Sequence, residues 1–222
     1  MKKYELTDDT RMVMGKKLTR IKALISFSDV EAGELGGYIE KEENLSHEGD
    51  AWVADNAWVT GDARVRGNAR VNSDAWVYGN ARVDGDARVT GNARVADNAK
   101  VHGNAQVTGD AQVTGNAWVY GNAWVYGNAR VDGDARVTGN ARVDGDARVA
   151  GNADILHITG LGTMHQTTTA YRTAQGIEIV CGYFRGDLDQ FRKQVEETSA
   201  GKVRKEYLKF AELIEIYFEM EE

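Results

Sequence analysis

The chain has 222 residues, a formal net charge of −7 and a single cysteine. One cysteine excludes an intramolecular disulfide, and no apolar run reaches the length that a transmembrane helix needs. The acidic residues are spread along the chain without a basic segment or an acidic tail, so we do not expect a nucleic-acid partner. Because no signal peptide is recognisable, we expect a cytoplasmic protein without membrane contact.

Residues 1–48 are predicted to form a small β-rich cap. Segments 4–6, 11–14 and 18–25 have strand-forming residues and are separated by turn-forming ones. The glycine-rich run 33–37 lacks the spacing of a phosphate-binding loop, so we interpret it as a linker into the next segment. A cap here would cover a strand edge that otherwise invites pairing with another chain.

Residues 49–156 consist of one six-residue unit repeated eighteen times without interruption, of which the segment 85–90 (Gly-Asp-Ala-Arg-Val-Thr) is typical. Ala and Val are two residues apart, so they share one face of a strand while the residue between them faces outward. Gly and Asn or Asp, at the first two positions, favour a turn. A fixed period this short predicts a solenoid of stacked strands with an Ala and Val interior.

The repeat resembles that of the hexapeptide-repeat family, whose fold is a left-handed parallel β-helix with three units per triangular coil. The resemblance covers all 108 repeat residues. It implies about six coils, in which residues eighteen positions apart stack on one another. In that register no corner Asp lies on another Asp, which agrees with the destabilising effect of stacked like charges on adjacent strands.

The chain after the repeats is predicted to divide at residue 162. Segment 157–161 keeps the alternation of the repeats and predicts a partial further coil of the β-helix, which would then span residues 49–162. Residues 163–222 are expected to form an α+β module, with a hairpin from segments 167–172 and 177–181. One helix should begin after Asp187 and a second near Val203, and both should pack over the last coils.

The layout is similar to that of uncharacterised bacterial and bacteriophage repeat proteins labelled as transferases or polymer-forming proteins. The similarity is carried by segments 35–40, 43–46, 167–171 and 180–186. It implies an architecture and a bacterial or phage-infected host cell, but no mechanism.

Catalytic and metal-binding residues are sparse. Many hexapeptide-repeat proteins are acyltransferases with a catalytic His at a subunit interface, and His102 is the single histidine within these repeats. We interpret it as a solvent-facing substitution, with general-base catalysis as the alternative. His157 and His165 lack the further ligands of a zinc site, and Cys181 lies in an apolar strand where a buried structural role is expected. We therefore expect neither a cofactor nor a metal.

The outward positions of the repeats differ in charge along the rod. Cations are predicted to share two faces, Arg64, Arg66, Arg82 and Lys100 on one and Arg94, Arg130 and Arg148 on another. Between residues 103 and 128, Asp110 is the only charged residue, and uncharged side chains face outward: Gln106, Thr108, Gln112, Thr114, Trp118, Tyr120, Trp124 and Tyr126. The four aromatic residues should wrap one corner. A smaller patch is predicted from Trp58, Trp76 and Tyr78.

Two interpretations of the aromatic residues remain open. Depleted charge together with Trp and Tyr is typical of an interface centre, whereas cross-strand aromatic ladders can simply stabilise a sheet.

The sequence as a whole predicts a non-enzymatic binding or scaffold protein that acts through the outer faces of a β-helix rod. The expected partner is another protein, such as a host protein bound by a phage protein, or a second copy of the chain in a homo-oligomer. The expected binding residues are Trp118, Tyr120, Trp124, Tyr126, Gln106 and Gln112, with the smaller patch as a second surface. The alternative is a trimeric acyltransferase with an acyl-coenzyme A donor and His102 as its base.

Overall fold

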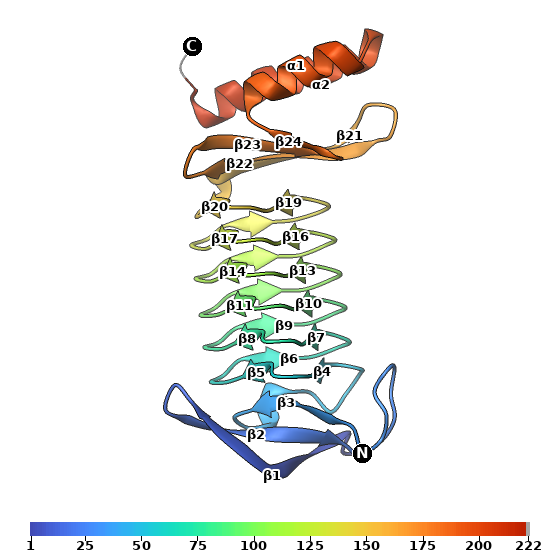
Figure 1. Ribbon diagram of the computed structural model, residues 1–222, viewed down its shortest axis with the longest axis vertical. Coiled ribbons are helices and arrows are strands. Elements are labelled where there is room, and N and C mark those ends of the chain that lie inside the picture. Colours follow the sequence, from blue (N-terminus) through green and yellow to red (C-terminus); the bar gives the residue numbers. More distant parts are fainter. Residues whose placement is uncertain (221–222) are drawn as a thin grey trace.

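The computed structural model describes residues 1–220, which form a rod of stacked coils closed by a cap at each end (Figure 1). Seventeen strands of two residues make up the rod and lie on three faces. Face I holds β4 (Trp52–Val53), β7 (Arg70–Val71), β10 (Arg88–Val89), β13 (Gln106–Val107), β16 (Trp124–Val125) and β19 (Arg142–Val143). Face II holds β5 (Trp58–Val59), β8 (Trp76–Val77), β11 (Arg94–Val95), β14 (Gln112–Val113), β17 (Arg130–Val131) and β20 (Arg148–Val149). Face III holds β6 (Arg64–Val65), β9 (Arg82–Val83), β12 (Lys100–Val101), β15 (Trp118–Val119) and β18 (Arg136–Val137).

The interior of the rod is made of the repeated Ala and Val side chains. Each of them from Ala51 to Val149 is at most 1% exposed. Strands pair in parallel with partners eighteen residues away, as between Arg88 and Gln106. The predicted parallel β-solenoid of about six turns, three units to a turn, is therefore confirmed.

The corners are joined by ladders of Asn side chains. The Nδ2 group of Asn98 donates to Oδ1 of Asn116 at 3.0 Å, and that of Asn116 donates to Oδ1 of Asp134 at 3.0 Å. Asp can only accept in such a ladder, so an Asp stacked on an Asp would lose the bond and add repulsion. This explains the distribution of Asp and Asn that the sequence shows.

The N-terminal cap continues face II. β1 (Tyr4–Val13) pairs antiparallel with β2 (Lys16–Ala23), which pairs antiparallel with β3 (Leu35–Ile39), and β3 then lies parallel on β5. Segments 4–6 and 11–14, predicted as two strands, form the single strand β1. The glycine run is also not a linker as predicted, because Gly36 and Gly37 lie within β3. A Cβ atom at Gly37 would stand 2.5 Å from the carbonyl oxygen of Ala57, so this close approach requires glycine.

Two side chains of the cap take the place of a missing coil. Within the rod, carbonyl groups such as that of Ala81 accept from the backbone of the coil beneath. In the first coil, Nδ2 of Asn44 donates instead to the carbonyls of Gly61 (3.0 Å) and Ala63 (2.8 Å). Nζ of Lys3 donates to the equivalent carbonyls of Gly49 (3.1 Å) and Ala51 (2.7 Å). Asn44, in the 3-10 helix η1 (Glu42–Asn44), and Lys3 are both buried.

The C-terminal module is a four-stranded antiparallel sheet covered by two helices (Figure 1). Its elements are η2 (Asn152–Asp154), β21 (Ile155–Leu161), β22 (Gln166–Thr173), β23 (Gly176–Cys181), β24 (Phe184–Gly186), α1 (Leu188–Thr198) and α2 (Gly201–Phe218). The predicted hairpin and both helices are confirmed. The side chain of Asp187 caps α1 by accepting from the backbone of Gln190 at 2.8 Å.

Two expectations about this module were wrong. Segment 157–161 forms no partial coil, because it belongs to β21, which pairs antiparallel with β22. Asp154 turns the chain away from the rod by accepting from the backbone of Ala150 and Gly151. The helices do not pack directly on the last coils either, because the sheet lies between them and the rod (Figure 1). No helix among residues 1–220 is both long and apolar enough to cross a membrane.

Candidate binding surface

The five tryptophans occupy equivalent outward positions but differ in how they are covered. Trp52 is 1% exposed beneath Tyr4 and Phe27 of the cap, and Trp58 is 4% exposed in a cluster with Leu18 and Tyr38. The smaller patch is therefore not the open surface that the sequence predicted. Trp58 and Trp76 do stack as expected, at 4.6 Å, but Trp58 is part of the packing between cap and rod.

Trp118, on face III, lies between two cations. Nζ of Lys100 is 4.2 Å from its ring and Cζ of Arg136 is 5.4 Å from it, so both sides of the indole are engaged in cation–π contacts. His102 stacks on Tyr120 with ring centroids 5.1 Å apart. This stacking fixes His102 against an aromatic neighbour in the ladder.

Trp124, on face I, is the tryptophan most open to solvent, with 42% of its surface exposed. Gln106 lies in register beneath it and Arg142 above it, with Cζ of Arg142 5.4 Å from the ring. Trp124 therefore offers an aromatic surface that the ladder does not use.

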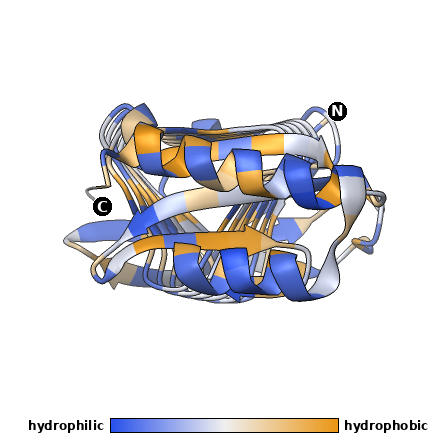
Figure 2. Ribbon diagram, turned by 90° about the horizontal axis from the view of Figure 1, so that it is seen from above, coloured by the Kyte–Doolittle hydropathy of each residue, from blue (hydrophilic) through white to orange (hydrophobic). Residues whose placement is uncertain are grey.

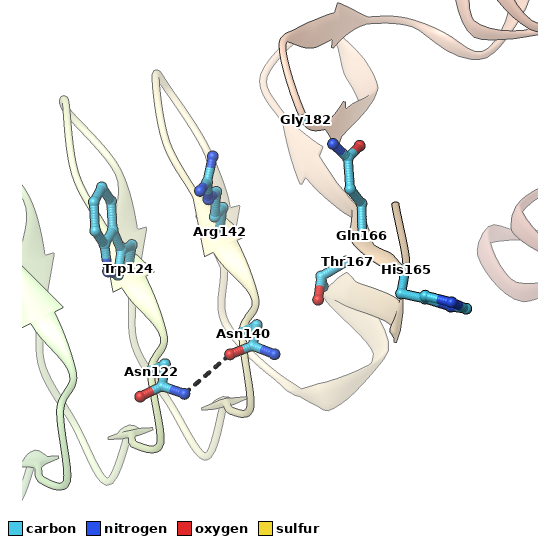
Figure 3. A pocket seen from close by; sticks show the side chains of 8 residues that line it. All are labelled: Asn122, Trp124, Asn140, Arg142, His165, Gln166, Thr167 and Gly182. Atoms are coloured by element: carbon cyan, nitrogen blue, oxygen red, sulfur yellow. Dashed lines mark hydrogen bonds between the residues drawn. The ribbon is translucent and has the colours of Figure 1, made fainter. Parts of the chain in front are cut away.

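A cleft of about 480 Å³ opens between Trp124 and the C-terminal module (Figure 3). One wall comes from two successive coils and consists of Trp124, Arg142 and the hydrogen-bonded pair Asn122 and Asn140 (3.1 Å). The other comes from the module: His165, Gln166, Thr167 and Gly182. In Figure 3 the imidazole of His165 points away from Trp124. The cleft thus combines an indole, a guanidinium and several amide or hydroxyl groups.

The module's share of this cleft was not predicted. The residues from 165 to 182 come near Trp124 only because β21 folds back over the rod instead of continuing it. The sequence carries no local signal for that reversal beyond the loss of the six-residue repeat.

A second hollow of about 220 Å³ lies on the other side of Trp124, lined by Gln106, Thr108, Trp124, Tyr126 and Arg142. The structure thus brings Gln106, Trp124 and Tyr126 together as expected. Gln112 is separate, because it lies on face II between Arg94 and Arg130.

Tyr126, which lines the second hollow, belongs to a buried polar cluster that connects the last coil to the module. Burial and a hydrogen bond to Asp144 raise the pKa of Tyr126 to about 12. Asp144, itself buried, also accepts from the hydroxyl of Tyr171 and lies 3.4 Å from Nη1 of Arg185. Burial and the same carboxylate raise the pKa of Tyr171. This network holds the module, and with it the far wall of the cleft, in a fixed position.

The cations of the rod stack in columns as predicted. On face III, Arg64 pairs with Arg82, and Arg82 with Lys100. Like charges in direct register destabilise a sheet. Yet among the repeat cations of the described residues, only Arg70 makes an ion pair, with Asp29. Of the remaining cations, four contact tryptophan rings instead: Arg94, Lys100, Arg136 and Arg142.

The remaining His and Cys side chains lie in the C-terminal module and in the N-terminal cap. Residues 1–220 contain no cluster of three or more His, Cys, Asp or Glu side chains suited to a metal ion. His157 is partly buried, which lowers its pKa. The Sγ atom of Cys181 accepts from the hydroxyl of Thr168 at 3.0 Å within the module.

One family model, described as the YdcK Beta solenoid repeat, matches residues 111–127. This segment includes the four aromatic residues Trp118, Tyr120, Trp124 and Tyr126. No curated protein matches the chain. The family match and the coil geometry together describe a repeat β-solenoid protein.

Proposed function

We propose that the chain is a binding protein that recognises a protein partner through its aromatic corner, defined as Trp118, Tyr120, Trp124 and Tyr126. The observation that carries the proposal is the exposure of Trp124 between two hollows. Interface hot spots are enriched in Trp and Tyr and lie at centres from which charge is depleted. A ladder that only stabilised the rod would not require the loss of charged residues between positions 103 and 128.

The cations at the rim of the corner support a partner with an acidic rim. Lys100 and Arg136 lie beside Trp118, and Arg142 lies above Trp124, with no ion pair from residues 1–220. A partner with an acidic rim around an apolar centre would neutralise these columns. The resemblance to bacterial and bacteriophage repeat proteins makes a bacterial host protein the first partner to test.

The test compares Trp124→Ala with Arg88→Ala, a control on the same face two coils below. Proteins captured by the wild type are identified, and the affinity of the purified partner is measured by calorimetry. Trp124→Ala should weaken binding by about 2 kcal/mol, close to 30-fold, while Arg88→Ala changes it little. Equal affinities for wild type and Trp124→Ala would contradict the proposal.

The competing function, an acyltransferase with His102 as base, has its own measurement. We expect no turnover of acetyl-coenzyme A by the purified protein. Turnover that is lost in His102→Ala would replace the binding proposal by the enzymatic one.

A further inference from the structure

The outer face of α2 has a group of apolar side chains that no other part of residues 1–220 covers. Phe210, Ile214 and Phe218 are buried against the sheet. Ile216 lies on the opposite side of the helix and is 75% exposed, and Leu213 lies on the flank next to it and is 44% exposed. In Figure 2, which looks onto the helices, the half of α2 nearer the C-terminus shows hydrophobic residues, whereas α1 is mainly hydrophilic.

The charges on the same face follow an order that opposes the helix dipole. Lys202, Lys205 and Lys209 are exposed in the first half of α2, whereas Glu212 and Glu219 are exposed toward its end. The first turn contains no acidic residue and the last turn no basic one. A helix alone is stabilised by the reverse order, so the stability of α2 itself does not explain this arrangement.

Ion pairs within the chain do not explain this order of charges along α2 either. Lys202 and Glu206 are 3.4 Å apart and Lys209 and Glu212 are 2.5 Å apart, but these pairs lie on the surface, where such bridges contribute little. Among the described residues, Lys205 makes no ion pair. The face therefore has a basic half, an acidic half and an apolar group with no partner.

We propose that this face binds the same face of a second copy, with the two α2 helices antiparallel about a twofold axis. A twofold interface pairs one patch with itself, so its two halves must complement each other. Antiparallel overlap of residues 203–218 places Lys209 opposite Glu212 of the second copy and, just beyond the overlap, Lys202 opposite Glu219 of the second copy. It also places Ile216 on the aliphatic stem of Lys205 of the second copy, which covers the apolar surface.

The area that two α2 helices can bury determines how tightly the dimer forms. An α-helix of 18 residues is about 27 Å long, so one helix pair buries less than a standard interface, and the dimer should be weak. Because α2 caps one end of the rod (Figure 1), two rods would meet at their C-terminal ends. Each dimer would then present two aromatic corners. This pairing goes beyond the proposed function and does not depend on it.

The test measures solution mass by sedimentation across a concentration series of the full chain. Wild type should shift from monomer to dimer, and Lys209→Glu or Glu212→Lys alone should raise the dimer dissociation constant about 10-fold or more. The double variant should restore dimerisation, because each exchanged charge again faces its opposite. Lys193→Glu, on the exposed side of α1, is the control and should leave the dimer unchanged.

Three results would overturn the proposal: a monomer at every concentration, single variants that dimerise like wild type, or a double variant as weak as the single ones. Circular dichroism melts confirm that each variant is folded. Trp124→Ala should dimerise normally, so failure of the aromatic corner and failure of the helix pairing are distinguishable.

Discussion

The first residue of each repeat unit determines whether neighbouring coils can stack. It is glycine with a positive φ in most units, as at Gly103 (φ 71°). A Cβ atom at Gly103 would stand 3.1 Å from the backbone nitrogen of Gly121 in the next coil. Asp97 occupies the same position with φ 58°, and its Oδ2 accepts from the backbone N–H of Gly115 at 3.1 Å. A carboxylate thus compensates there for the strain that its Cβ causes.

This compensation predicts different effects for two substitutions at Gly103. Gly103→Ala should lower the free energy of unfolding by about 1–2 kcal/mol, because alanine in the left-handed region gains nothing in return. Gly103→Asp should lower it less, since the new carboxylate can accept from the backbone of Gly121 and precedes Asn104 as Asp97 precedes Asn98. Urea unfolding of both variants measures the difference. Equal losses would show that the Asp bond does not compensate.

At the scale of elements, the coil strands could be predicted from sequence throughout, whereas the elements of the caps could be predicted but their packing on the rod could not. Alternation of Ala and Val is a local property, so each coil strand follows from its own six residues. The burial of Trp58 depends instead on β1 and β2, which come from residues far away in the chain. Segment 157–161 keeps the repeat alternation, yet the antiparallel partner β22 determines its path.

The same distinction applies to the candidate site. Trp124, Tyr126 and Gln106 could be placed together from the eighteen-residue register, because each coil repeats the geometry of the one before. The wall formed by Gln166 and Thr167 required the folded module. The different solvent exposures of the tryptophan side chains could not be predicted either. They arise from contacts with the N-terminal cap and with cations in neighbouring coils.

The N-terminal cap depends on a buried cation, which makes its stability sensitive to pH. Burial lowers the pKa of Lys3 from 10.5 to about 8, against a smaller opposing effect of Asp50, and Arg70 lowers it further. Below pH 8 both the folded and the unfolded chain hold the proton, so folding bears the full desolvation cost. Between pH 8 and 10.5 the folded chain releases the proton first, and stability gains from Lys3 as pH rises.

This titration predicts that the contribution of Lys3 to stability becomes more favourable by about 3 kcal/mol between pH 7 and 10.5. Lys3→Met keeps the length of the side chain and removes the titration. Subtracting its free energies of unfolding from those of wild type at each pH isolates the effect of Lys3. The difference should move in favour of wild type as pH rises. A difference that stays flat or falls would show that the ammonium is not desolvated in the cap.

At the scale of the whole molecule, the coils share one backbone geometry, and the end coils differ in their hydrogen bonds to the caps. Lys3 and Asn44 contact the first coil alone. At the other end, Oγ1 of Thr169 accepts from the backbone of Arg142, and Oδ1 of Asn152 accepts from that of Arg136. In a solenoid each repeat interacts with its neighbours only, so the middle of the rod should tolerate a change of length that both caps survive.

Deletion of residues 97–114 removes one complete coil and tests this modularity. The new junction places Asn80 under Asn116 and Arg88 under Trp124, so the corner ladders and the aromatic corner persist. We expect a folded rod, shorter by about 4.8 Å in small-angle scattering, with a modestly lower Tm because one set of coil contacts is lost.

Deletion of residues 97–105 is the matched control. It removes two corners and the strand β12 (Lys100–Val101) between them but keeps the following Gln106–Val107 strand. Half a coil is then missing, so the coil cannot close and the protein should unfold. A nine-residue deletion that remains as stable as the eighteen-residue one would mean that stacking at intervals of eighteen does not hold the rod together.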